Sequence, residues 1–142
     1  NHCTMVNYGS SNLSHQKATF FVNNVLYCDN RANVAPLLVN VTNSIVYGSL
    51  DEELAFGFED GANFNVVFDH CLLKTERVSD TLEFIDVIKN LDPEFVDRVE
   101  DDYRIEANSP AVNAGKSTSV LLDLNSITRI DQPDIGAYEY CP

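Results

Sequence analysis

The side chains best suited to acid–base or metal chemistry are the three histidines, His2, His15 and His70. His2 and His70 occupy the same place in a repeated pattern described below, three repeats apart. If each repeat adds one stacked strand at about 4.8 Å, the two rings lie roughly 14 Å apart. Zinc ligands lie only about 2 Å from the metal, so this pair cannot share one ion. The histidines therefore predict no metal site.

Asp69 and His70 are sequence neighbours that could form a carboxylate–imidazole pair. Neighbouring side chains in a strand point to opposite faces of the sheet, so we expect the two not to interact. No Ser-His-Asp or Cys-His set can be assembled from the other residues. Basic residues within the repeats are also few: Lys17, Arg31, Lys74 and Arg77. The sequence thus predicts no catalytic residue and leaves the binding residues unassigned.

Five carboxylates lie between Leu50 and Gly61, at Asp51, Glu52, Glu53, Glu59 and Asp60. Calcium takes several oxygen ligands, so a calcium ion is one interpretation of this run. The spacing matches no calcium loop, and charge runs of this kind are typical of solvated surface segments. We expect a solvated insertion and no cofactor, with calcium as the alternative.

The elements that position these residues follow from a repeat. Four segments begin with Asn or His, continue through small or apolar residues and then turn polar: 2–7, 24–29, 43–48 and 70–75. Their starts at 2, 24, 43 and 70 are separated by 22, 19 and 27 residues. Irregular steps between similar strands are typical of a solenoid whose insertions loop out from one side. The repeat predicts a parallel β-helix with these strands stacked in register, and an antiparallel sandwich with Asn-rich turns is the alternative.

Three further features follow from this pattern. The leading Asn or His residues would form one column, in which side-chain amides bond from one strand to the next. After the fourth segment, Ser79 or Asp80 could cap a short helix through 82–88, although a packed loop fits the same residues. At the end of the chain, Pro133 and the alternation of Tyr138 with Tyr140 predict a last strand that closes the core, with Gly136 leaving room for a neighbouring group.

The cysteines are expected to remain unlinked within the repeat. The predicted register places Cys3, Cys28 and Cys71 roughly 11 Å or more apart, whereas the Cα atoms of a disulfide lie within about 7 Å. Only Cys141, after the last strand, could reach a partner. Cysteines that face the core are predicted to act as small apolar fillers.

From residue 92 onward, a series of motifs follows a known order: Asp92-Pro93-Glu94-Phe95-Val96-Asp97, Asp102-Tyr103-Arg104-Ile105, Ser109-Pro110-Ala111-Val112-Asn113-Ala114-Gly115, Asp123-Leu124, Arg129, and 133–140. This series resembles the C-terminal end of right-handed parallel β-helix proteins of the pectin-lyase-like superfamily. It is most similar to the bacterial choice-of-anchor and right-handed β-helix repeat proteins. Asn113 stands where the family usually has Asp, and Asn125-Ser126 where it has Asp-Gly. We expect structural roles for these motifs, with Arg129 pairing with Asp134 or Asp123.

The resemblance implies an all-β fold: a right-handed parallel β-helix with C-terminal coils and a terminal closing strand. Residues 1–78 would form coils, and residues 79–142 the C-terminal coil and capping segment of the same domain. Because the sequence opens inside a strand pattern, we expect a fragment of a longer protein, with upstream coils of the same polypeptide as its neighbours. The implied function is a non-catalytic part of a secreted, cell-surface or periplasmic bacterial protein that binds carbohydrate or acts in adhesion. The terminal part of a polysaccharide lyase or glycoside hydrolase is the alternative.

The charge and hydropathy of the chain limit the classes of partner that it is expected to bind. Twenty-two acidic against nine basic side chains give a net charge of −13, which opposes binding to nucleic acid. No run of about 18 apolar residues is present, so no membrane span is expected. A neutral partner such as carbohydrate remains compatible with this balance.

Overall fold

The structure is a computed structural model that describes residues 1–9, 14–29, 31–78 and 83–142. Within these residues the chain is all-β, with thirteen strands and no helix. The all-β class predicted from the sequence is therefore confirmed.

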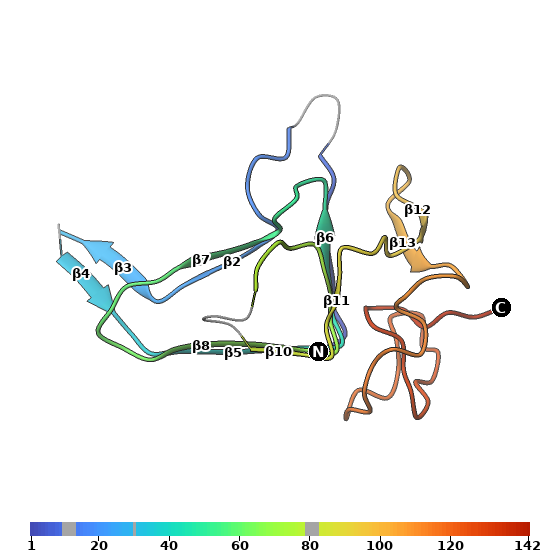
Figure 1. Cartoon of the computed structure of the whole chain (residues 1–142). Helices are drawn as coiled ribbons and strands as arrows, with labels where there is room; N and C mark the ends of the chain where they lie inside the picture. Colours follow the sequence, from blue (N-terminus) through green and yellow to red (C-terminus); the bar gives the residue numbers. More distant parts are fainter. Residues whose placement is uncertain (10–13, 30, 79–82) are drawn as a thin grey trace.

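Nine of the strands form three parallel sheets. The first contains β1 (Thr4–Asn7), β6 (Ile45–Gly48), β9 (Leu72–Leu73) and β11 (Ile88–Lys89) in that order. The second contains β5 (Leu37–Thr42), β8 (Phe64–Asp69) and β10 (Glu83–Ile85), and the third pairs β2 (Phe20–Asn23) with β7 (Leu54–Gly57). Along the chain, β1, β2 and β5 belong to the first, third and second sheets, and β6, β7 and β8 repeat this order. We call each such passage through the three sheets a circuit. Figure 1 views these three sheets nearly edge-on, so that the strands within each sheet overlap.

The predicted register holds for three of the four segments. Thr4 pairs with Ile45 and Ile45 with Leu72, so 2–7, 43–48 and 70–75 lie in register as expected. The prediction for 24–29 is wrong, because β3 (Val25–Cys28) pairs antiparallel with β4 (Arg31–Val34) in a hairpin beyond the corner of the second and third sheets. The fourth strand of the first sheet is β11, which the repeat did not include.

The Asn and His residues that lead the stacked segments have a backbone role. His2, Asn43, His70 and Asp86 precede the four strands of the first sheet, with φ of 52°, 47°, 51° and 48°. Asn, Asp and His are the side chains that best tolerate this left-handed conformation, which turns the chain from the second sheet into the first. Asn24, which leads the segment that does not join the stack, lacks this conformation.

The first sheet is buried on both faces. On its inner face, Val46 and Leu73 pack with Leu54, Val66 and Phe68 from the other two sheets. On its outer face, Ile45 and Leu72 pack with Phe95, Ile105, Ala111 and Ile135 from the C-terminal part of the chain. Figure 1 shows this part, which includes the hairpin of β12 (Phe95–Asp97) and β13 (Asp102–Ile105), beside the first sheet. Sheets covered on both faces favour the continuous apolar runs seen in this sequence.

Residues 133–140 close the outer core without forming the predicted strand. Gly136 donates its N–H to the carbonyl of Asn43, which lies in the turn before β6, and Ala137 donates to the Thr4 side-chain hydroxyl. The segment therefore does not form the regular backbone hydrogen bonds of a strand. Gly136 has φ of 111°, and a Cβ there would lie 2.9 Å from Ile45. A close approach at Gly136 was expected from a backbone or a ring, and the group that lies there is the Ile45 side chain; the predicted strand is wrong.

Two other expectations concern the connecting segments. The helix considered for 82–88 is wrong over 83–88, where β10 and β11 form instead, while the proposed caps Ser79 and Asp80 lie outside the described residues. The solvated insertion expected at 50–61 is also wrong, because β7 belongs to the third sheet and Leu54 is fully buried. The four residues of β7 are too few for their alternating pattern to stand out in a sequence segment that carries five carboxylates.

Candidate functional site

Asp69, His70 and Lys116 form a polar cluster where the second sheet turns into the first. His70 Nδ1 lies 2.7 Å from Asp69 Oδ1, and Lys116 from the C-terminal part contacts the other carboxylate oxygen. The expectation that Asp69 and His70 do not interact is wrong. Alternation applies within a strand, whereas the left-handed backbone of His70 turns its ring back toward the preceding side chain.

This cluster has the elements of a proton-transfer site. Partial burial alone would raise the pKa of Asp69, but hydrogen bonds from Lys116 and His70 lower it below its usual value. With Nδ1 directed to this carboxylate, the other ring nitrogen is left for a ligand, and it lies 3.8 Å from the exposed Asp86 carboxylate. The cluster therefore places a carboxylate, an imidazole and an ammonium group side by side at this corner.

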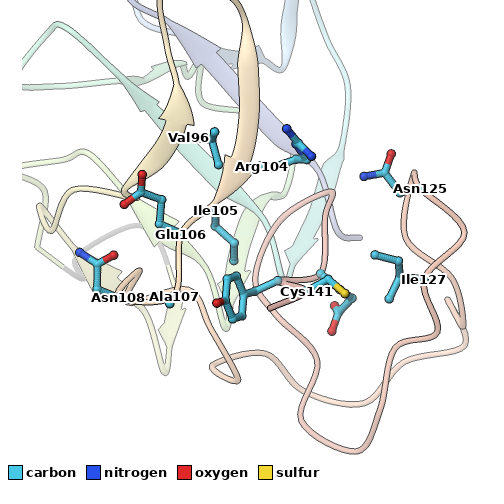
Figure 2. A pocket seen from close by; sticks show the side chains of 11 residues that line it. Val96, Arg104, Ile105, Glu106, Ala107, Asn108, Asn125, Ile127 and Cys141 are labelled. Carbon is cyan, nitrogen blue, oxygen red and sulfur yellow. The ribbon is translucent and has the colours of Figure 1, made fainter.

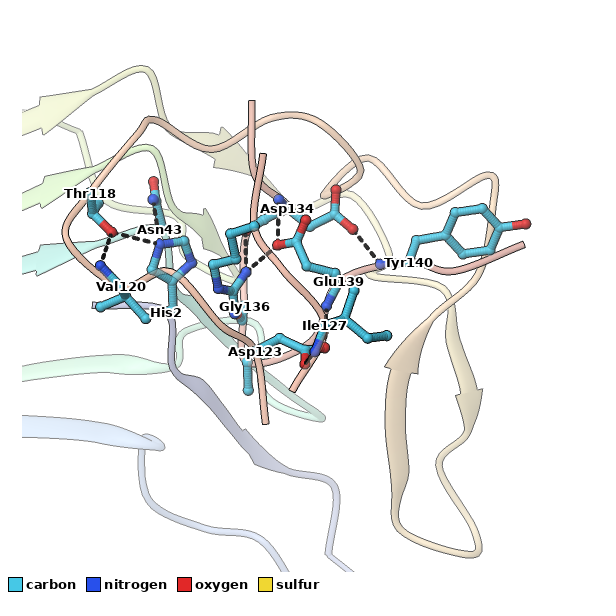
Figure 3. A network of polar contacts seen from close by, with 12 residues as sticks. His2, Asn43, Thr118, Val120, Asp123, Ile127, Asp134, Gly136, Glu139 and Tyr140 are labelled. Atoms are coloured by element: carbon cyan, nitrogen blue, oxygen red, sulfur yellow. Dashed lines mark hydrogen bonds and ion pairs between the residues drawn. The ribbon is translucent and has the colours of Figure 1, made fainter. Parts of the chain in front are cut away.

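A second group of polar side chains is buried under the C-terminal part (Figure 3). The Arg129 guanidinium contacts the Glu139 carboxylate and donates to the carbonyls of Asp134 and Gly136. The expected pairing of Arg129 with the Asp134 or Asp123 carboxylate is therefore wrong. Those two carboxylates instead accept backbone N–H groups, Asp134 from Asn113 and Tyr140, and Asp123 from Asn125, Ile127 and Glu139. These contacts hold loops in place.

His2 lies at the edge of this group. Its Nε2 accepts from Asn43 Nδ2 at 3.0 Å and lies 3.1 Å from the Thr118 hydroxyl (Figure 3). The contact with Asn43 is one instance of the predicted bonding between column residues. Burial, followed by the nearby charge of Arg129, lowers the pKa of His2 to about 4. His2 is thus neutral at pH 7 and serves as a packing and hydrogen-bonding group.

A cleft of about 420 Å³ lies between β13 and the C-terminal tail (Figure 2). Its polar lining includes Arg104, Glu106, Asn108, Asn125 and Glu139. Burial raises the pKa of Glu139, an effect that the Arg129 guanidinium opposes. Arg104 is already paired with Asp102. The Asn108 and Asn125 side-chain amides and the Glu106 carboxylate suit a small neutral ligand that carries several hydroxyl groups.

Three of the five carboxylates of the 51–60 run accept hydrogen bonds from the chain itself. Glu53 is fully buried and accepts from the Thr19 amide and hydroxyl and from the Leu50 amide, while Glu52 accepts from the Thr75 hydroxyl. Glu59 accepts from the Tyr27 hydroxyl. Across residues 1–9, 14–29, 31–78 and 83–142, no group of three or more His, Cys, Asp or Glu side chains could hold a metal ion.

All four cysteines are free thiols. Cys71 is buried, as predicted for a small apolar filler, and burial raises its pKa to about 11. Cys28 lies in the β3–β4 hairpin, so its separation from Cys3 arises from the hairpin and not from the predicted stacking.

Three aromatic side chains are exposed around the third sheet and the hairpin. Phe21 in β2 is 60% exposed, Tyr27 in β3 63% and Phe58 just after β7 54%. The sequence analysis did not single them out, although Phe21 follows the inward-facing Phe20 in a strand whose burial alternates. This alternation was the signal that could have identified Phe21.

No family model and no curated protein matches this chain. In the part of the chain that the structure describes, no helix is long and apolar enough to cross a membrane.

Proposed function

We propose that the chain forms the terminal coils of a right-handed parallel β-helix in a secreted or surface-exposed bacterial protein, where it is a non-catalytic scaffold that binds carbohydrate. The observation that carries this proposal is the set of three parallel sheets visited in turn. The matched register of β1, β6 and β9, with a left-handed residue before each strand, supports repeated circuits of one kind. The motif order from residue 92 supports the placement at the C-terminal end.

Exposed aromatic rings support a binding role for this scaffold. Sugar rings stack on aromatic faces and use neighbouring polar groups for hydrogen bonds, and they require no charge on the protein. Phe21 lies on the outer face of the third sheet, where its partner strand offers only the small side chains of Ala55 and Gly57. Tyr27 is held by Glu59, which adds a carboxylate beside a second ring. Exposed aromatic rings with adjacent polar groups suit a neutral glycan.

Isothermal titration calorimetry against a panel of neutral and acidic oligosaccharides tests this proposal. We expect weak binding of neutral glycans that falls at least tenfold in a Phe21→Ala, Tyr27→Ala double variant. Val99→Ala is the matched control, because Val99 is 88% exposed but lies in the C-terminal part. Absence of binding to any glycan, or equal loss in the control, contradicts the binding role.

The second candidate is the terminal part of a polysaccharide lyase or glycoside hydrolase. It is favoured by one observation, the clustering of Asp69, His70 and Lys116 on a partly exposed corner. Carboxylates together with a basic residue on one face are what acid–base cleavage of a polysaccharide requires. Cleavage of pectin, alginate or a neutral glycan that is abolished by His70→Asn, but not by His15→Asn, would favour the enzyme over the scaffold.

A further inference from the structure

Equivalent connections in the two circuits bring a serine, a histidine and a glutamate together. In each circuit one connection leads from the first sheet to the third: residues 8–19 join β1 to β2, and residues 49–53 join β6 to β7. Because β1 pairs with β6 and β2 with β7, the described ends of the two connections lie side by side. His15 comes from the first connection, and Ser49 and Glu53 come from the second.

The contacts of His15 determine which of its ring nitrogens carries a proton. Nε2 lies 2.6 Å from the Lys17 carbonyl oxygen and 3.4 Å from the Glu53 carboxylate, and both of these groups can only accept. Nε2 therefore carries the proton and donates it. In the neutral ring Nδ1 keeps its lone pair, and it lies 3.1 Å from the Ser49 hydroxyl oxygen. The Ser49 hydroxyl thus donates to Nδ1, which is the contact between a nucleophile and its general base.

The three side chains differ in their exposure to solvent. Glu53 is fully buried and the His15 side chain is 2% exposed, whereas Ser49 is exposed. The backbone N–H groups of Leu50 and Thr19 donate to the two oxygens of the Glu53 carboxylate, one to each, and so fix its direction. The carboxylate and the imidazole are therefore held in place, while an incoming molecule can reach the serine hydroxyl.

A cleft of about 310 Å³ lies beside this group. His15 lines it together with four polar residues, Asn7, Ser14, Gln16 and Lys17. Asn7 is also a neighbour of Ser49, because its carbonyl accepts the Ser49 N–H. The volume suits a small molecule, and the Asn7 amide and Lys17 ammonium groups are donors suited to a carbonyl oxygen.

We propose that Ser49 is a nucleophile that takes the acyl group of a small ester, with His15 as its general base and Glu53 positioning the imidazole. The serine oxygen forms a bond to the acyl carbon, its proton passes to Nδ1, and the alcohol leaves with that proton. Water then attacks the acyl-serine and gives one proton to Nδ1. The serine oxygen leaves with this proton, which releases the carboxylic acid and restores the hydroxyl.

The ring is used in the reverse sense from the familiar serine hydrolases. There the carboxylate holds Nδ1 and the serine contacts Nε2, whereas here Glu53 lies at Nε2 and Ser49 at Nδ1. The two nitrogens have the same chemical roles in either sense, since one N–H is oriented by acceptors and the other nitrogen accepts the serine proton. Members of the group lie up to 38 positions apart in the sequence, so no local pattern identifies it.

This inference goes beyond glycan binding and does not depend on it. The reaction cleaves an ester and leaves glycosidic bonds intact, so the scaffold stays non-catalytic toward a glycan chain. The Phe21→Ala, Tyr27→Ala double variant should react with esters like the wild type, because neither residue lines the cleft beside His15. Failure of one proposal is therefore distinguishable from failure of the other.

A fluorophosphonate tests the nucleophile, because an activated serine displaces its fluoride and forms a stable bond to phosphorus. We expect mass spectrometry to show an adduct that maps to Ser49. Ser49→Ala should abolish this adduct, and His15→Asn should slow its formation about 100-fold or more. Ser14→Ala is the matched control and should react like the wild type, because Ser14 is an exposed serine beside the same histidine whose hydroxyl accepts from Gln16.

Hydrolysis of p-nitrophenyl acetate tests the complete reaction and the role of Glu53. Ser49→Ala should lower the rate at least about tenfold with an unchanged melting temperature, since this side chain is exposed. Glu53→Gln should lower kcat and leave KM unchanged, whereas a merely structural role would not affect kcat selectively. A wild-type chain without an adduct at Ser49, equal labelling in His15→Asn, or hydrolysis that persists in Ser49→Ala overturns the proposal.

Discussion

The three parallel sheets and the C-terminal part beside them are stabilised in different ways. The sheets are held by regular backbone ladders around a core of aliphatic and aromatic side chains. Residues 106–140 contain no strand, and their order depends on carboxylates that accept backbone N–H groups, and on Arg129. Both regions pack against the first sheet, one on each face. Removing the polar contacts should therefore leave the sheets folded, whereas disrupting the first sheet should also unfold the C-terminal part.

The largest effect is expected from Phe68→Ala. Phe68 is fully buried and its ring lies 5.4 Å from Phe20 and 5.8 Å from Phe84, so the change leaves a cavity in the interior shared by the sheets. We expect a loss of about 3–5 kcal/mol in the free energy of unfolding, measured by urea denaturation, with both regions destabilised together. Phe21→Ala, at an exposed position, should change it little. A loss below about 1 kcal/mol for Phe68→Ala would contradict its place in the inner core.

The Arg129→Met variant tests whether the two regions unfold independently. It leaves the Glu139 carboxylate without its buried cation, at a cost of about 3 kcal/mol. Hydrogen exchange should accelerate at the amides of Ile135 and Gly136 and stay unchanged in β5 and β8. The double variant Arg129→Met, Glu139→Gln should recover part of the loss, because no unpaired buried charge remains. Equal acceleration in the sheets would show that the two regions unfold as one unit.

Acid should loosen the contact between the regions through His2. Its pKa is about 4 in the folded chain against 6.5 for the free side chain, so the unfolded chain binds the proton more tightly. The stabilisation is complete above pH 6.5 and is lost as the pH falls from 6.5 to 4, by at most about 3 kcal/mol. The melting temperature of His2→Gln should therefore fall less than that of the wild type over this interval. Parallel curves for the two proteins would contradict the role of His2.

The smallest effect is expected from Lys116→Met. The ion pair with Asp69 is partly exposed, so its loss should cost less than about 1 kcal/mol in the free energy of unfolding. The same change removes a hydrogen bond that lowers the pKa of Asp69, and this pKa should rise. NMR titration of the Asp69 carboxyl measures the shift. An unchanged pKa would show that His70 alone controls this carboxylate.

The candidate site was less predictable than the fold. The sequence placed His70 and Asp69 next to each other but assigned them opposite directions, because alternation was applied across a left-handed residue. Lys116 lies 47 positions beyond Asp69, and no local pattern links the two. Arg129 was expected to pair with Asp134 or Asp123, whereas its actual partner, Glu139, depends on how residues 133–140 fold over the first sheet.

The sequence by itself determined the β class, the positions of three stacked strands and the apolar role of Cys71. These follow from local chemistry: alternation of side chains, and the tolerance of Asn and His for a left-handed turn before each strand. Only the tertiary structure decided that 24–29 pairs with 31–34 in a hairpin and that 88–89 completes the first sheet. It also decided that residues 133–140 close the core without forming a strand. Those outcomes depend on which distant backbone and side-chain groups are free to bond, and a short β-rich segment carries no record of its partner.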